Sequence, residues 1–135
     1  MKSPSEIIEL MLAGDAFSNG LGMEVLHIEP GQCTVRMQVN ERMVNGFNIA
    51  HGGITYALAD SAMAFASNAH GFQCVSIDTA ISHIKKVQIN EVLKATCTSL
   101  SRNRKVGIYE VKVTNQSDEL VAHFKGTVLL SDREW

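Results

Sequence analysis

Residues 45–66 read NGFNIAHGGITYALADSAMAFA, and this stretch decides the fold. The pair Gly52-Gly53 opens a segment that is apolar at almost every position, which is typical of a helix buried inside other structure. One carboxylate, Asp60, lies in the middle of this segment, and a buried carboxylate is costly unless it has a partner. The first N–H groups of a helix lack partners within it and attract negative charge. The stretch therefore predicts a long buried helix that carries half of a hydrolytic site.

Before this helix, the chain predicts one short helix and one β-hairpin. Ser3-Pro4-Ser5-Glu6 is typical of a helix start, with a capping Ser, a Pro in the first turn and a Glu three residues after the Ser. A glycine at position 14 is expected to end that helix, and glycines at 20 and 22 mark a turn. The predicted strands cover residues 25–29 and 33–39, and a loop follows over residues 41–50.

After the central helix, which we expect to run from Gly52 to Ala69, every segment predicts β-structure. Apolar residues alternate with polar ones over residues 75–81, 93–97 and 109–113, and a last strand covers residues 120–130. The helix would be roughly 27 Å long, close to the roughly 33 Å of a ten-residue strand. One antiparallel sheet can therefore curl around one helix. We expect an α+β fold in a single domain over residues 1–135.

The composition excludes several classes of protein. Of the 135 residues, 45% are hydrophobic, which is enough to form a core, and the net charge of −2 disfavours a nucleic-acid or membrane-surface partner. No apolar run approaches the roughly 20 residues that span a bilayer. The three cysteines form no Cys-x-x-Cys pair and the first residues lack a signal-peptide pattern. We therefore expect a cytoplasmic protein.

The predicted order of elements resembles the hotdog fold, in which a curved antiparallel sheet wraps one long helix. The motif Asn45-x5-His51-Gly52-Gly53-x6-Asp60 resembles the acyl-CoA thioesterases of the phenylacetate-degradation (PaaI-like) type. The match also extends over residues 56–62, 75–78 and 122–127. The resemblance implies an enzyme that hydrolyses an acyl-CoA thioester to a carboxylic acid and free CoA.

The resemblance also implies a role for each catalytic residue. The backbone N–H of Gly52 would polarise the thioester carbonyl, and Asp60 would be the general base or the nucleophile. Asn45 would hold the attacking water or the thioester. Ser76 would assist, although from the residue alone an ordinary strand serine is the interpretation that we favour. His51 could be a base, but a ring that fixes the loop is the interpretation that we favour, because the carboxylate already fills the role of base.

Substrate binding is expected from glycine amides and from basic side chains. Gly53 would complete an anion cradle beside Gly52, because side chains there would block a ligand from the N–H groups. Five basic residues near predicted strand ends could contact the phosphates of CoA or simply face solvent: Lys85, Lys86, Arg102, Arg104 and Lys105. Many relatives carry an aromatic residue followed by Arg-Pro where this chain reads His83-Ile84-Lys85-Lys86.

No metal or other cofactor is expected. The histidines at 27, 70 and 123 have no metal-ligand spacing with cysteines or acids. Coenzyme A is part of the substrate in this hypothesis.

The spacing of the motif also predicts a shared active site. Gly52 and Asp60 are eight residues apart, which is roughly 12 Å along a helix, yet both must lie about 3 Å from the reacting atoms. The donor of one subunit must therefore meet the acid of another. Two antiparallel central helices about a two-fold axis satisfy this condition. We expect a homodimer with shared sites, and a pair of such dimers as a homotetramer.

Two other functions stay open from the sequence. A hotdog dehydratase or hydratase would act on acyl thioesters, but those enzymes usually pair a His with a helix acid in a different motif. A non-catalytic acyl-CoA-binding module would have no use for Asp60. The sequence does not choose between an aryl and a fatty acyl group.

Overall fold

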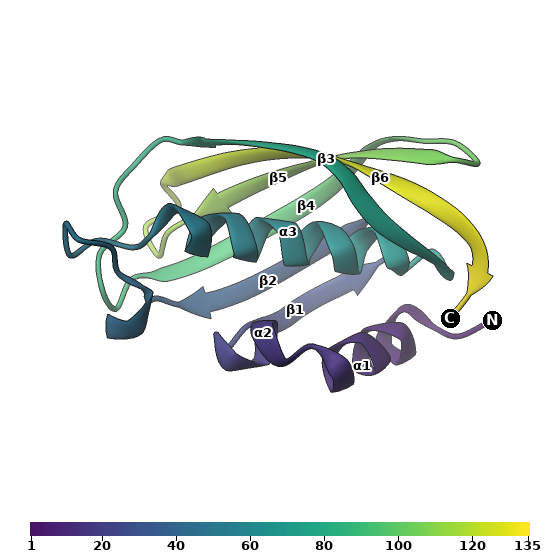
Figure 1. The fold of residues 1–135 in the computed structure, drawn as a ribbon, viewed down its shortest axis with the longest axis horizontal. Coiled ribbons are helices and arrows are strands. Elements are labelled where there is room, and N and C mark those ends of the chain that lie inside the picture. The colour runs from purple at the N-terminus through teal and green to yellow at the C-terminus, as the bar shows by residue number, and fades with distance from the viewer.

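A single curved sheet wraps one long helix in the computed structural model, which describes all residues from Met1 to Trp135 (Figure 1). The elements in chain order are α1 (Pro4–Gly14), α2 (Ala16–Gly20), β1 (Glu24–Glu29), β2 (Gln32–Gln38), a 3₁₀ turn (Glu41–Met43), α3 (Gly52–Asn68), β3 (Phe72–His83), β4 (Val92–Arg102), β5 (Val106–Thr114) and β6 (Leu120–Glu134). The six strands pair antiparallel in the order β1-β2-β4-β5-β6-β3. The expected hotdog architecture is confirmed.

The helix boundaries follow from local caps. Ser3 and Glu6 form the expected capping box at the start of α1. At the start of α3, the Nδ1 atom of His51 accepts a hydrogen bond from the Gly53 N–H at 2.8 Å. Gly71, with a φ of +110°, follows the last turn of α3 and allows the chain to reverse into β3. The central helix therefore begins where the sequence predicts and ends one residue earlier.

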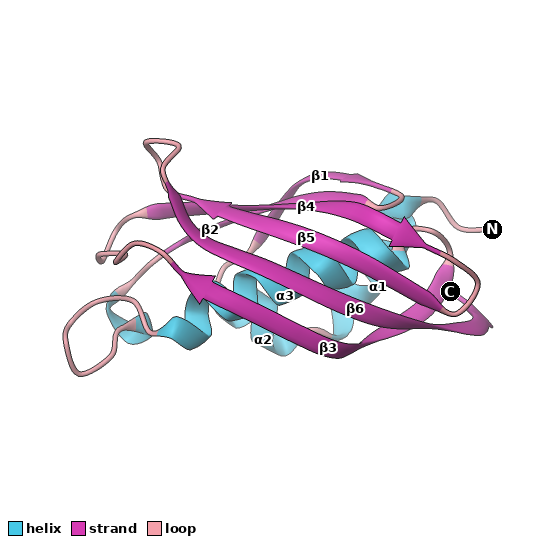
Figure 2. Cartoon of the chain, turned by 90° about the horizontal axis from the view of Figure 1, so that it is seen from above, coloured by secondary structure: helices cyan, strands magenta, loops and turns pink.

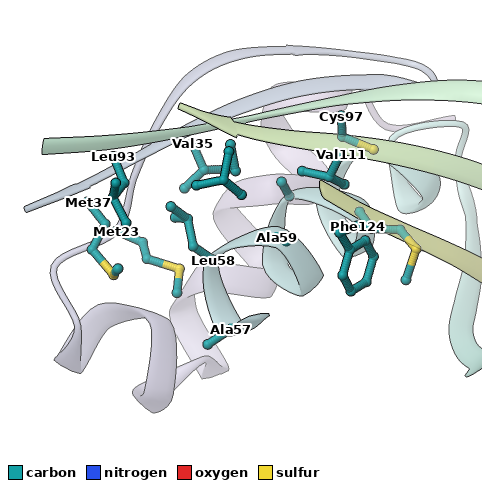
Figure 3. Close-up of a cluster of buried hydrophobic side chains, with 14 of the residues drawn as sticks. Met23, Val35, Met37, Ala57, Leu58, Ala59, Leu93, Cys97, Val111 and Phe124 are labelled. Carbon is teal, nitrogen blue, oxygen red and sulfur yellow. The ribbon is translucent and has the colours of Figure 1, made fainter. Parts of the chain in front are cut away.

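The core lies between α3 and the concave face of the sheet (Figure 3). Every second residue of the central strands points into it, including Val35, Met37, Leu93, Cys97 and Val111, as the alternation predicts. The alanines of α3 let the sheet approach the helix closely. Burial of these apolar side chains is the main force that holds the sheet on the helix.

The structure adds one helix that was not predicted and departs from one expected pattern. A short helix, α2, precedes the glycine turn, with the Asp15 side chain accepting from the Ser18 N–H at its start. In β3, the alternation over residues 75–81 does not match the observed burial. Val75 and Ile77 are 66% and 56% exposed, and the pairing with β6 shifts register between Ser76 and Asp78. The reason is that β3 is an edge strand, so its residues lack a neighbour on one side.

All three α-helices cover the same face of the sheet, and the opposite face is open (Figure 2). None of these helices combines the length and the apolar character that a membrane crossing demands. The N- and C-termini lie together at the end of the molecule where α3 ends and β3 begins (Figure 1). The predicted site residues lie near the edge strand β3, the loop before α3 and the end of the molecule where the two termini meet.

Candidate active site

The first hollow of interest opens at the N-terminus of α3. It has a volume of about 300 Å³, and its lining includes Asn45, Gly52, Thr55, His83, Lys85 and Lys86. The loop before α3 supplies Asn45, while the segment after β3 supplies the histidine and both lysines. The fold therefore brings the predicted donor end of the motif together with two of the predicted basic residues.

The Gly52 N–H has no hydrogen-bond acceptor in the chain. The Gly53 N–H is already bound to His51 Nδ1, so the expected cradle of two amides is reduced to one free donor. The same bond gives His51 the loop-fixing position that we favoured from the sequence. A helix N-terminus with one free amide can stabilise a developing oxyanion.

The side-chain amide of Asn45 has one atom that holds the loop and one that is free for a ligand. Its Oδ1 atom accepts hydrogen bonds from Phe47 N at 2.9 Å and Ile49 N at 3.4 Å, which closes the loop before α3. Its Nδ2 atom has no partner in the chain. The amide group is thus held in place by its oxygen and keeps two N–H donors for a ligand.

His83 was not predicted as a site residue, yet it lies against Gly52. A Cβ atom at position 52 would be 3.1 Å from His83 Nε2. His83 Nδ1 is 3.2 Å from Thr55 Oγ1, and the Thr55 hydroxyl is placed to donate to the Gly52 carbonyl at 3.0 Å. Because that hydroxyl proton is used, the Thr55 oxygen accepts from His83 Nδ1, and this contact holds Nε2 beside Gly52. The only sequence signal was that His83 stands where many relatives carry an aromatic residue.

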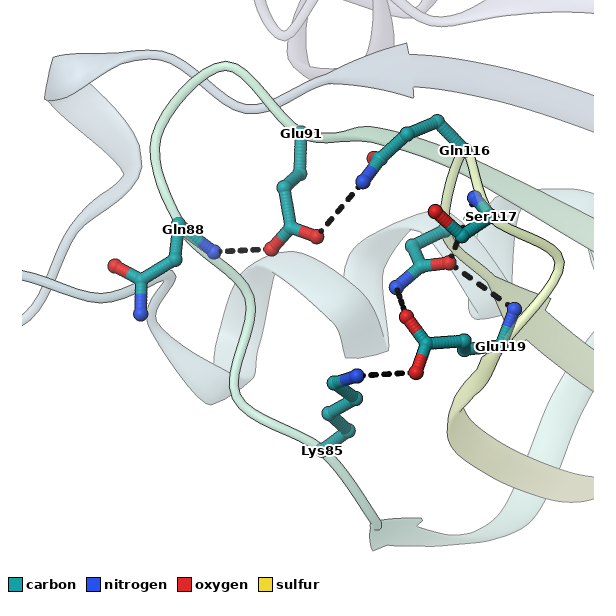
Figure 4. Close-up of polar contacts among 7 residues, drawn as sticks. Lys85, Gln88, Glu91, Gln116, Ser117 and Glu119 are labelled. Atoms are coloured by element: carbon teal, nitrogen blue, oxygen red, sulfur yellow. Dashed lines mark hydrogen bonds and ion pairs between the residues drawn. The ribbon is translucent and has the colours of Figure 1, made fainter.

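The two lysines of the first hollow differ in their partners. Lys85 forms an ion pair with Glu119, which also accepts a hydrogen bond from the Asn115 side chain (Figure 4). The hydrogen bond from Lys85 lowers the pKa of Glu119 below its ordinary value. Lys86 forms no ion pair in the chain. Lys86 is therefore the free cation at this end of the molecule.

Asp60 lies in a second hollow, on the side of α3 that faces β3. The hollow has a volume of about 370 Å³, and its lining includes Asp60, Met63, Asn68, Cys74, Ser76 and Trp135. Asp60 forms no hydrogen bond or ion pair with another residue, and its burial raises the pKa of its carboxyl group. Ser76 of β3 lines the same hollow, so the fold brings this pair of predicted residues together.

The five predicted basic residues do not gather in one place within one chain. Lys85 and Lys86 follow β3 at the end where His83 pairs with Ala122. Arg102 is the last residue of β4, and Arg104 and Lys105 belong to the turn between β4 and β5. All three lie at the opposite end of the sheet, where Lys105 O accepts a hydrogen bond from Leu130 N. Arg102 and Arg104 line a separate hollow there beside Asp132.

The donor and the acid thus lie in different hollows of one chain. Gly52 lines the first hollow and Asp60 lines the second. Eight helical residues separate them, so about 12 Å of helix lies between the two groups. One chain presents two incomplete halves of a hydrolytic site. No group of three His, Cys, Asp or Glu side chains that could hold a metal ion occurs in the structure.

Comparison with known proteins shows the family of the chain. The family model of the thioesterase superfamily matches residues 47–122, which include the start of α3, Asp60 and β3. The chain belongs to the thioesterase superfamily. Its sequence is 31% identical over 116 residues to the acyl-coenzyme A thioesterase PaaI of Escherichia coli, covering 86% of this chain and 83% of that protein.

Solved structures of the superfamily share the whole fold. The structure of E. coli PaaI from the phenylacetic acid degradation operon has a TM-score of 0.94 and 27% identity, covering 97% of this chain and 95% of that one. The TT0310 protein of Thermus thermophilus has a TM-score of 0.82 and 36% identity, covering 85% and 97%. The resemblance that the motif indicated is therefore confirmed over nearly the full length of the chain.

Proposed function

We propose that this superfamily member hydrolyses acyl-CoA thioesters to a carboxylic acid and free CoA, in a homodimer with two shared active sites. The observation that carries the proposal is the free Gly52 amide at the start of α3 together with the half-buried Asp60 on the same helix. The name of the E. coli relative, an acyl-coenzyme A thioesterase, supports the choice of substrate.

Each residue has a defined task in this proposal. The Gly52 N–H donates to the thioester oxygen and stabilises the negative charge that develops on it. Asn45 Nδ2 donates to the same oxygen or to the attacking water. Asp60 removes a proton from that water, or attacks the carbonyl carbon directly. Ser76, which lines the same hollow as Asp60, assists in this step. The C–S bond then breaks, and CoA leaves as a thiolate that takes up a proton. Where Asp60 itself attacks, the acyl group stays on its carboxylate as a mixed anhydride, and water hydrolyses this anhydride to the carboxylic acid and free Asp60.

The dimer follows from the separation of the two hollows. The exposed apolar residues of β3, Val75 and Ile77, lie on an unpaired sheet edge, which is a ready surface for a second copy. A two-fold axis beside this edge would place two α3 helices antiparallel. Gly52 of each subunit would then face Asp60 of the other, and two equal sites would form.

The same arrangement gathers the basic residues. With antiparallel helices, the end of one subunit that carries Lys85 and Lys86 lies near the opposite end of its partner. Arg102, Arg104 and Lys105 would therefore reach the site from the second chain. Positive groups at the site entrance suit the phosphates of CoA. The proposed reaction uses no metal or added cofactor, and we place the enzyme in the cytoplasm, with two dimers pairing into a tetramer.

The test is a panel of acyl-CoA thioesters with a thiol reagent that detects released CoA. We expect turnover of at least one acyl-CoA, and a loss of kcat on the order of 10² or more in Asp60→Asn, as for the loss of a general base. Asp60→Asn keeps the shape of the side chain, so circular dichroism should be unchanged. A folded wild-type protein that binds acyl-CoA but releases no thiol would refute the enzyme and favour a binding module.

A further inference from the structure

The hollow beside Asp60 is elongated along the C-terminal half of α3. Its lining follows the helix from Asp60 through Met63 and Ala64 to Asn68, which is roughly 12 Å of helix axis. The start of β3 forms the facing wall. Trp135 lines the hollow together with Met11 of α1. The hollow therefore leads from the reacting carboxylate toward the joined ends of the chain.

Trp135 is held in a fixed position at the far end of this hollow. Its indole Nε1 donates to Asn68 Oδ1 at 2.9 Å, and its backbone N–H donates to the Gly71 carbonyl at 3.1 Å. The end of β6 bends past the C-terminus of α3 toward α1 (Figure 1), which carries the last residue to this place. Asn68 in turn accepts from Cys74 N at 3.0 Å, so that helix, edge strand and indole share one anchor.

The far end of the hollow offers no free polar group from α3. Asn68 Nδ2 donates to the carbonyls of Ala64 at 2.8 Å and Cys74 at 3.2 Å, and its Oδ1 atom is used twice. Ser67 Oγ donates to the Ala64 carbonyl at 3.2 Å. The remaining lining combines apolar side chains with two polar ones from β3, Gln73 and Ser76. The α3 side of this end therefore offers an acyl chain only apolar contact.

We propose that Trp135 forms the end wall of the acyl pocket and sets the longest acyl group that the enzyme accepts. The inference rests on the proposed function, because it takes Asp60 as the position of the thioester carbonyl. With roughly 12 Å between Asp60 and Asn68 along the helix, the limit falls at about eight carbons.

The first experiment uses Trp135 itself as the probe, since it is the only tryptophan in the chain. S-alkyl-CoA thioethers of increasing chain length cannot be hydrolysed, and their binding can be followed by calorimetry and by tryptophan fluorescence. We expect free CoA and S-ethyl-CoA to bind without a spectral change, and the emission to change once the chain has about eight carbons. Binding of a twelve-carbon thioether with no change in emission would overturn the inference.

The second experiment compares Trp135→Ala with Trp135→Phe. For the wild type, kcat/KM should rise roughly fourfold for each added methylene up to the limit and then fall. Trp135→Ala should move the limit to longer chains by two carbons or more. Trp135→Phe loses the bond to Asn68 but keeps a ring, so its limit should stay within one carbon of the wild type. An unchanged limit in Trp135→Ala, or an equal shift in both variants, would contradict a wall formed by the ring.

These two experiments distinguish the inference from the proposed function. The fluorescence experiment needs no hydrolysis, so it can fail while thioesterase activity is present, or succeed while no acyl-CoA is hydrolysed.

Discussion

Replacing Gly52 by proline removes the one free N–H at the start of α3 while leaving the helix able to form. Gly52 is the first residue of α3, a position where proline is tolerated. His51, the preceding residue, has φ −61° and ψ 139°, which is the extended conformation that a following proline requires. The new Cβ atom would lie 3.1 Å from His83 Nε2, so this ring must move by a few tenths of an ångström.

Gly52→Ala is therefore the matched control, because it adds the same Cβ and keeps the N–H. Loss of one oxyanion donor lowers kcat by roughly 10²–10³. We expect Gly52→Pro to lose at least that much and Gly52→Ala to lose much less. If both variants lose the same activity, contact with His83 and not the amide explains the effect.

Mixing this variant with Asp60→Ala tests the shared site. Each homodimer should be inactive, since both of its sites lack either the donor or the acid. Refolding equal amounts together should give about half heterodimers at random assortment. In each heterodimer one site carries both defects and the other carries none, so activity should recover to about a quarter of the wild type.

The assay is release of CoA from a good acyl-CoA substrate, with heterodimers measured by native mass spectrometry on differently tagged chains. Recovery near a quarter supports a donor and an acid from different subunits. No recovery, with heterodimers present and Gly52→Pro folded, would refute the reasoning and require the two groups to act within one chain.

Three further predictions concern the acid, the lysines and the sheet edge. Burial raises the pKa of Asp60 above its ordinary 3.8, so the ionised carboxylate destabilises the folded protein at neutral pH. Asp60→Asn should therefore raise Tm at pH 7. The difference in Tm between variant and wild type should vanish at a pH low enough to protonate Asp60 in both the folded and the unfolded protein. The acid limb of wild-type kcat/KM should lie above the usual aspartate range for the same reason. Lys86→Ala should raise KM several-fold with little change in kcat. Glu119→Gln frees Lys85 from its ion pair and should lower KM. Both effects should shrink in high salt. Introducing lysine at both Val75 and Ile77 should give an inactive monomer by light scattering, while lysine at Thr96 on the open face should leave the dimer intact.

Much of the fold could be predicted because its signals are local. The capping box at Ser3 and the Gly-Gly start of α3 were both found where the sequence predicts them. Alternation identified β2, β4 and β5, because every second residue over residues 33–37, 93–97 and 109–113 is buried against one helix. The same alternation in β3 predicted a buried face that the structure does not have, because the exposed apolar residues of this edge strand also repeat at every second position.

The site was predictable only in part. The motif residues Asn45, Gly52 and Asp60 could be selected because they lie within 16 residues of one another, and helical rise alone showed that donor and acid cannot meet in one chain. The sequence did not show that His51 already occupies the Gly53 amide. Nor did it show that His83 lies against Gly52, 31 residues earlier in the chain.

The sequence by itself determined the type and order of the elements, the buried helix and the acid on it, since period, caps and turns depend on neighbours in the chain. Only the tertiary structure decided which side chains share a hollow. Ser76 lines the same hollow as Asp60 because β3 pairs with β6, and Trp135 reaches Asn68 because β6 bends around the end of α3. Contacts between distant parts of the chain depend on strand register and sheet curvature. Both come from the packing of the whole domain and leave no local pattern in the sequence.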